Sequence, residues 1–190
     1  MTKDVFIPIR ADGYEFCHPI AVDDFESINE LTSAPTRAWR PVEMEIIRED
    51  NGEFLLESDS PWLGSHALIF RGSALGQVLE GDGDDLEAFL RARGELCPLR
   101  CSQTRVELFR PPIIDALDEA LSAVVRFPTG RIMMVDRYVF REDVLAGVDL
   151  FMIPNLRVSP TFVSGHFVER WKTLALRGLE FQEVASVRTE

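Results

Sequence analysis

Cysteine and histidine are scarce in this sequence. The 190 residues include three of each, and the cysteines are Cys17, Cys97 and Cys101. An odd number of cysteines without paired spacing does not build a disulfide framework. The spacing in CPLRC, from Cys97 to Cys101, fits neither a redox motif nor a zinc knuckle. We therefore expect reduced thiols, as in the cytosol, and neither a metal nor another cofactor.

Long apolar runs are absent as well. A membrane-spanning helix needs about 18 apolar residues or more, and no stretch of the chain approaches that length. The amino-terminal segment MTKDVFIPIRADGYEF has neither the apolar run nor the small-residue cleavage site of a signal peptide. The sequence thus predicts a cytoplasmic protein without a membrane partner.

Basic residues are too few for a protein that binds nucleic acid. The chain carries 20 Lys and Arg against 32 Asp and Glu, a formal net charge of −12 at pH 7. Such a charge repels DNA, RNA and anionic lipid. It suits a basic protein partner, or it serves solubility alone. Most of the excess lies in residues 1–60, with 14 acids and 5 bases, whereas residues 61–190 hold 18 acids and 15 bases.

The residues that are abundant predict a folded core. Apolar residues make up 46% of the chain and include 13 Phe and 3 Trp. Short apolar segments and helical patterns follow one another without regular alternation, so we expect an α+β fold. We predict a single compact domain of short, mostly antiparallel strands with several short helices. Its parts would be an amino-terminal extension packed on the main domain (1–41), the main α+β domain (42–185) and a tail (186–190).

The apolar spacing and the turn residues also predict individual elements. Strands are expected at 43–48, 53–57, 67–70, 104–109, 132–135 with a continuation near 139–140, 150–153, 161–163 and 179–184. Helices are expected at 23–31, 73–79, 84–94, 113–125, 141–146 and 167–178. Asn51-Gly52 is a strong hairpin signal. Asp23 or Asp24 would cap the first of these helices, and Asp84 with Glu87 would form a capping box.

Five polar residues are the candidates for a catalytic site: Ser58, Asp59, His66, Ser164 and His166. Folding could gather a Ser-His-Asp hydrolase site from such scattered positions. However, no serine has the flanking glycines of a nucleophile elbow. The alternative interpretation is that the first two bond turn backbone and that the histidines are structural. The sequence favours this second interpretation, so we expect no catalytic residue.

The run EGDGDD at residues 80–85, followed by Glu87, is the most acidic loop. It does not fit a calcium-binding loop, which needs alternate oxygen ligands with glycine and glutamate at fixed positions. Carboxylates at a helix start are favoured by the helix dipole, and between glycines they could also face a partner. We predict a partner-binding surface at Asp82, Asp84, Asp85 and Glu87, with Asp23 and Asp24 as a competing surface.

Three blocks of the sequence resemble a known family in their order and spacing. They are SDSPWLGSHALIFRGSAL (58–75), VELFRPPIIDALDEALSAVVRFPTGRIMMVDRYVFRED (106–143) and VDLFMIPNLRVSPTFVSGHFVERWKTLALRGLEFQEV (148–184). The last block has an Asp-apolar-Phe strand, a proline, a second strand, a helix and Gly-Leu-x-Phe. Together the blocks resemble immunity protein family eleven, the myxobacterial-type immunity domain of polymorphic toxin systems.

The resemblance implies a function. Proteins of this family protect a producing cell by binding a co-encoded toxin or secretion-system effector, of which type VI systems are one source. The resemblance implies occlusion of the toxin's active site without catalysis or a cofactor, and fold-determining roles for Phe151, Pro154, Ser164, Gly178 and Phe181. The alternative is an enzyme, either a small hydrolase or one that reverses the toxin's modification, with the Ser/His/Asp candidates as its site.

Overall fold

The computed structural model describes residues 3–30, 39–79 and 83–187. Its strands are β1 (Lys3–Arg10), β2 (Phe16–Pro19), β3 (Met44–Ile47), β4 (Glu49–Asp50), β5 (Glu53–Phe54), β6 (Leu68–Arg71), β7 (Glu95–Pro98), β8 (Val106–Arg110), β9 (Ala123–Arg126), β10 (Ile132–Arg137), β11 (Leu150–Phe151), β12 (Phe162–Ser164) and β13 (Leu179–Val187). Its helices are α1 (Asp23–Asn29), α2 (Gly72–Leu75), α3 (Leu86–Arg91), α4 (Gly165–Thr173) and the 3₁₀ helix η2 (Asp143–Leu145). The paired strands of every sheet are antiparallel, which confirms the predicted α+β class.

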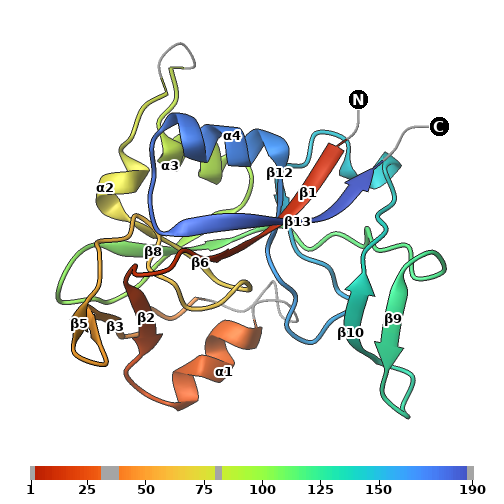
Figure 1. Ribbon diagram of the computed structural model, residues 1–190, viewed down its shortest axis with the longest axis horizontal. Helices are drawn as coiled ribbons and strands as arrows, with labels where there is room; N and C mark the ends of the chain where they lie inside the picture. The colour runs from red at the N-terminus through yellow and green to blue at the C-terminus, as the bar shows by residue number, and fades with distance from the viewer. Residues whose placement is uncertain (1–2, 31–38, 80–82, 188–190) are drawn as a thin grey trace.

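The largest sheet has the order β11-β12-β1-β13. β1 pairs with β13 along its whole length and with β12 at Val5 and Phe6 (Figure 1). Pro8, which lacks an N–H to donate, lies where β1 has only β13 as a neighbour. Residues 3–10, at the start of the predicted extension, thus form an inner strand among strands from residues 150–187. The boundary predicted at residue 41 stays a prediction.

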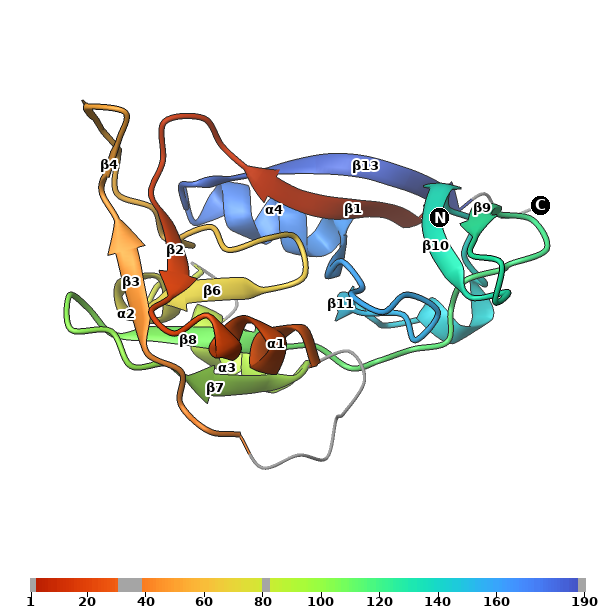
Figure 2. The same cartoon turned by 90° about the horizontal axis from the view of Figure 1, so that it is seen from below.

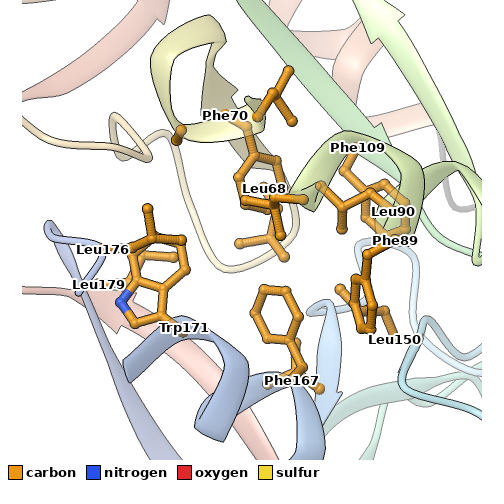
Figure 3. Packing of buried hydrophobic residues seen from close by; sticks show 14 of the residues in the cluster. Leu68, Phe70, Phe89, Leu90, Phe109, Leu150, Phe167, Trp171, Leu176 and Leu179 are labelled. Carbon is orange, nitrogen blue, oxygen red and sulfur yellow. The ribbon is translucent and has the colours of Figure 1, made fainter. Parts of the chain in front are cut away.

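A three-stranded sheet, β6-β8-β7, lies beside the β1–β13 pair, and α3 and α4 lie on one side of both (Figure 1, Figure 2). The core between these helices and the strands contains Phe70 from β6 and Phe167 and Trp171 from α4 (Figure 3). The Trp171 ring centroid lies 6.5 Å from that of Phe70 and 6.4 Å from that of Phe167. The predicted apolar face of the last helix therefore does point into the core.

Two further apolar clusters complete the interior. One joins the β2–β3 pair and Ile28 of α1 to the three-stranded sheet. The other joins the β9–β10 hairpin to the large sheet through Phe140, Phe151 and Phe162. The Phe140 ring centroid lies 5.5 Å from that of Phe151 and 5.1 Å from that of Phe162. None of the helices in the described ranges has the length and apolar character needed to cross a membrane.

Several predicted elements are confirmed with shifted ends. Helix α1 forms, but its N-cap is Val22 and no side chain caps it, so the predicted capping by Asp23 or Asp24 is wrong. Leu31, which we included in this helix, lies outside the described residues. The helix predicted at 73–79 ends at Leu75, because the chain then turns to form a bridge with the start of α3. The helix predicted at 141–146 is only the short η2.

The helix predicted at 113–125 is wrong. Ile113 and Leu117 form isolated β-bridges with other segments, and the last residues of the range belong to β9. Between them, the Asp118 carboxylate accepts hydrogen bonds from the backbone N–H groups of Ala120 and Leu121 at 3.0 and 3.1 Å. The apolar spacing is nearly helical, but backbone bonding to distant segments overrides it. Apolar spacing alone cannot separate these two outcomes over a short range.

Candidate functional site

Asp149 is the centre of a polar cluster in the carboxy-terminal part. Its carboxylate accepts hydrogen bonds from Arg93 Nε at 2.6 Å and from Ser164 Oγ at 2.7 Å, and it lies 3.1 Å from His166 Nδ1. Burial raises the pKa of Asp149, but the hydrogen bonds from Arg93, Ser164 and His166 outweigh burial and hold that pKa below its ordinary value. These contacts keep the Asp149 carboxylate ionised just before β11 and balance its charge with that of Arg93.

This arrangement brings together two of the catalytic candidates without forming a triad. In a Ser-His-Asp triad the histidine lies between the serine and the carboxylate and removes the serine proton. Here Asp149 lies between Ser164 and His166, and the Ser164 hydroxyl also accepts the N–H of Phe167 at 3.3 Å. Ser164 is therefore the N-cap of α4. These contacts give Ser164 a structural role. A serine just before the apolar residues of a helix is a typical N-cap, so the sequence could have indicated this role.

Ser58 and Asp59 bind the chain just before β13. The Ser58 hydroxyl accepts the N–H of Ser60 at 3.1 Å and donates to the Arg177 carbonyl at 3.4 Å. The Asp59 carboxylate accepts the N–H of Arg177 at 2.8 Å. Ser58 also lies against Gly178, where an added Cβ would come within 1.8 Å of the Ser58 Oγ atom. These bonds to turn backbone fit the structural interpretation of both residues.

Beneath this contact lies a buried ion pair that the sequence analysis missed. Glu15 and Arg71 are 2% and 3% exposed and pair through Oε2 and a terminal guanidinium nitrogen. Glu15 also accepts the N–H of Ser58 at 3.1 Å and binds Arg48 Nε at 3.1 Å, while Arg71 Nε donates to the Ser58 carbonyl at 2.9 Å. The pair fixes the segment before β6 to the segment before β2. No spacing links two residues so far apart in sequence.

His66, the other histidine among the catalytic candidates, and the cysteines show no arrangement for chemistry. The His66 ring lies against Gly64, and burial lowers its pKa. All three cysteines are free thiols; burial raises the pKa of Cys17, and it raises the pKa of Cys97 to about 11. A thiol with a raised pKa is a poor nucleophile at neutral pH. Within the described ranges, no group of three or more His, Cys, Asp or Glu residues could hold a metal ion.

The acidic loop before α3 is only partly available for contact. Asp82 lies outside the described residues, and Asp84 is exposed. Asp85 is half-buried and is the N-cap of α3, because its Oδ1 atom accepts the N–H of Ala88 at 2.7 Å. The cap is therefore Asp85, and the prediction that Asp84 begins the helix is wrong by one residue.

Glu87 is bound by two arginines. Its carboxylate accepts from Arg91 Nε at 3.0 Å and from Arg105 at 3.1 Å, and both arginines also reach Glu107. The hydrogen bond from Arg91, more than that from Arg105, holds the pKa of Glu87 below its ordinary value. Two carboxylates and two guanidinium groups cancel in charge, so Glu87 adds little negative field at this surface.

The competing surface, Asp23 and Asp24, lies on the first turn of α1. Asp23 is exposed and Asp24 is half-buried. The last turn of this helix lines a cleft of about 990 Å³ that it shares with the β9–β10 hairpin. Both signs of charge line this cleft, with Glu26 3.3 Å from Arg157, and none of the five catalytic candidates reaches it.

A comparison with curated protein sequences finds none that matches this chain. A comparison with family models finds a match to the Immunity protein family (Imm11) over residues 112–186. The match includes β9 to β13 without the last residue of β13, together with α4 and Asp149, Ser164 and His166 of the polar cluster, whereas Arg93 and the block at 58–75 lie outside it. Residues 112–186 thus have the sequence features of the Immunity protein family (Imm11), which confirms for this part of the chain the family indicated by the sequence.

Proposed function

We propose that this protein is an immunity protein that binds a co-encoded bacterial toxin in the cytoplasm and neutralises it by occluding its active site. The match of residues 112–186 to the Immunity protein family (Imm11) carries the proposal. An immunity protein that acts by occlusion needs a stable binding surface but no catalytic site. The toxin would be a domain of a polymorphic toxin or of a secretion-system effector, for example one from a type VI system.

The bonding of the catalytic candidates supports a non-enzymatic role. Ser58 and Ser164 use their hydroxyl groups to bond turn and cap backbone. An acyl-transfer enzyme needs a nucleophile within hydrogen-bond reach of a base, and the base next to Ser164 is a carboxylate whose pKa is lowered. The alternative, a small hydrolase or an enzyme that reverses the toxin's modification, would have to use this pair or groups other than the five candidates.

Growth rescue tests the proposal. The full chain is co-expressed with the toxin domain encoded next to it, and we expect growth where the toxin domain alone stops it. The two purified proteins should then form a stable complex, and the toxin's activity should fall in proportion to the complex formed. Growth arrest that persists at equal expression, with no complex detected, would overturn the proposal.

Alanine variants separate occlusion from catalysis. His66→Ala and His166→Ala remove the imidazoles that an acid–base mechanism would need, and we expect both variants to rescue growth fully. His166 has a 60% exposed side chain, so its loss should leave the fold intact. A folded His166→Ala or His66→Ala variant that binds the toxin but no longer rescues would favour the enzyme.

A further inference from the structure

The hairpin formed by β4 and β5 exposes apolar side chains that the fold does not use. Every residue from 48 to 54 is exposed, and Figure 2 shows the hairpin standing away from the sheets. Phe54 is 85% exposed and Leu56 is 59% exposed. Single exposed apolar residues are ordinary on a protein surface. Two large ones at alternate positions of one projecting segment form an apolar face without a partner.

The register places these side chains on one side of the hairpin. Phe54 pairs directly with Glu49, and side chains of directly paired residues point to the same face. Beyond the end of β5 the pairing continues by one bond, from Leu55 N to the Arg48 carbonyl at 2.9 Å, so alternation along this extended segment would place Leu56 on that side as well. The face thus consists of two apolar side chains with a carboxylate next to them.

The backbone of this segment is held firmly. Asn51 and Gly52 have φ of 51° and 83°, the left-handed conformation that a two-residue hairpin turn requires. Leu56 N donates to the Gly13 carbonyl at 2.8 Å, and the Leu56 carbonyl accepts from Glu15 N at 2.9 Å. An anchor that is already ordered loses little conformational entropy when it binds a partner.

Carboxylates lie on this face and on the neighbouring parts of the hairpin without cations of their own among the described residues. The exposed acids from just before β3 to the segment after β5 are Glu43, Glu45, Glu49, Asp50, Glu53 and Glu57. Among the ion pairs of the described residues, none involves these six. The exposed Arg48 is bound to the buried Glu15 at 3.1 Å. By contrast, Glu87 and Glu119 each pair with arginine.

We infer that the β4–β5 hairpin is the surface that docks the toxin, with Phe54 as an apolar anchor entering a pocket in a basic protein surface. This inference rests on the proposed function. Aromatic anchors carry much of the energy of protein interfaces, and complementary charge at the rim speeds encounter. A second copy of this chain would bring six more carboxylates to the hairpin and its surroundings, and nucleic acid would bring phosphates, so like charge disfavours both partners.

The β9–β10 hairpin provides a matched comparison. Met134 is 49% exposed, and Asp136, two positions further along β10, is also exposed. The charged side chains nearby include the exposed Arg126, Arg131 and Arg137, so this hairpin lacks a uniform negative charge. Substitutions here also change one apolar and one acidic side chain, but on a surface outside the proposed docking surface.

Binding kinetics of the full chain with the purified toxin domain encoded next to it test the inference. We expect Phe54→Ala to raise the Kd about tenfold or more, mainly through faster dissociation. Glu49→Lys combined with Glu53→Lys should slow association at low salt, and this difference should narrow at high salt. Met134→Ala and Asp136→Lys should change neither rate by more than about twofold.

Hydrogen exchange provides a second measurement that needs no variant. The amide groups of residues 48–56 should exchange more slowly in the complex than in the free protein, and those of residues 123–137 should not change. Unaltered binding by the Phe54 and Glu49/Glu53 variants, or protection confined to the β9–β10 hairpin, would overturn this docking surface while leaving the proposed function intact. Absence of any complex with the unaltered chain would instead overturn the proposed function and, with it, this inference.

Discussion

Gly178 lies directly against Ser58, so closely that a Cβ atom on Gly178 would come within 1.8 Å of the Ser58 Oγ atom. Gly178 has a φ of +102°, and Ser58 is fully buried. The contact joins the start of β13, inside the family-matched part of the chain, to a segment outside that part. The matched residues are thus packed onto the amino-terminal half through an approach that only glycine permits.

Gly178→Ala should destabilise the protein more than a glycine substitution at an open turn. Gly147 has a similar positive φ of 77° but no atom within 4 Å of an added Cβ. Gly147→Ala should cost about 1–2 kcal/mol for the left-handed backbone alone. Gly178→Ala should cost about 1–3 kcal/mol more, because the methyl group forces Ser58 aside. Urea unfolding measures both variants, and equal losses would show that the contact relaxes freely.

Trp171→Ala should remove a large part of the core. Trp171 is 3% exposed, and its ring centroid lies 5.8 Å from that of Phe181. Truncation of a buried tryptophan costs about 3–5 kcal/mol, a large share of the roughly 5–15 kcal/mol that stabilises a domain. Lys172→Ala, on the exposed side of the same helix, is the control and should change the stability by less than about 0.5 kcal/mol. A melting temperature that does not change in Trp171→Ala would contradict this packing.

The two aspartates before α3 should differ in their effect on stability. Asp85→Ala removes the N-cap bond to Ala88 and should cost about 1 kcal/mol. Asp84 is exposed, so Asp84→Ala should cost less than about 0.5 kcal/mol. Charge reversal at Asp85 would therefore change both the capping of α3 and any contact with a partner, and the two effects could not be separated. Asp84→Lys is the cleaner test of the acidic loop, and an association rate insensitive to it at low salt would exclude that loop from the interface.

Asp149 should make stability depend on pH. Because its folded-state pKa is lowered, its stabilising effect is complete above the ordinary aspartate pKa and is lost as the pH falls through the folded-state value. Asp149→Asn should therefore be less stable than the unaltered chain at pH 7, by about 1.5–3 kcal/mol for hydrogen bonds to a charged group. The difference should shrink below about pH 4. Asp136→Asn, at an exposed site, is the control for the substitution itself. A stability difference between Asp149→Asn and the unaltered chain that stays the same at every pH would show that Arg93 does not hold the carboxylate charged.

The local elements were largely predictable, because their causes are local. Asn51-Gly52 forms the expected turn between β4 and β5, and the apolar residues around Trp171 form the expected buried face of α4. The helix expected at 113–125 failed because its apolar residues are used in bridges to distant segments. Strand β1 was not predicted, because it is stabilised by pairing with β12 and β13 at the other end of the chain, which local sequence patterns do not reveal.

The sequence by itself determined the α+β class, the family indicated by residues 112–186, and the excess of acid in the first 60 residues. These three features follow from the composition and from the order of residues along the chain, without knowledge of which segments meet in the fold. Only the tertiary structure decided which carboxylates are bound and which are not. Glu87 meets Arg91 one turn further along α3, but it meets Arg105 only because the chain just before β8 lies beside this helix, whereas the acids of the β4–β5 hairpin have no such neighbours among the described ion pairs. The reason is physical: charge pairing depends on distances of a few ångströms between segments that lie far apart in the chain.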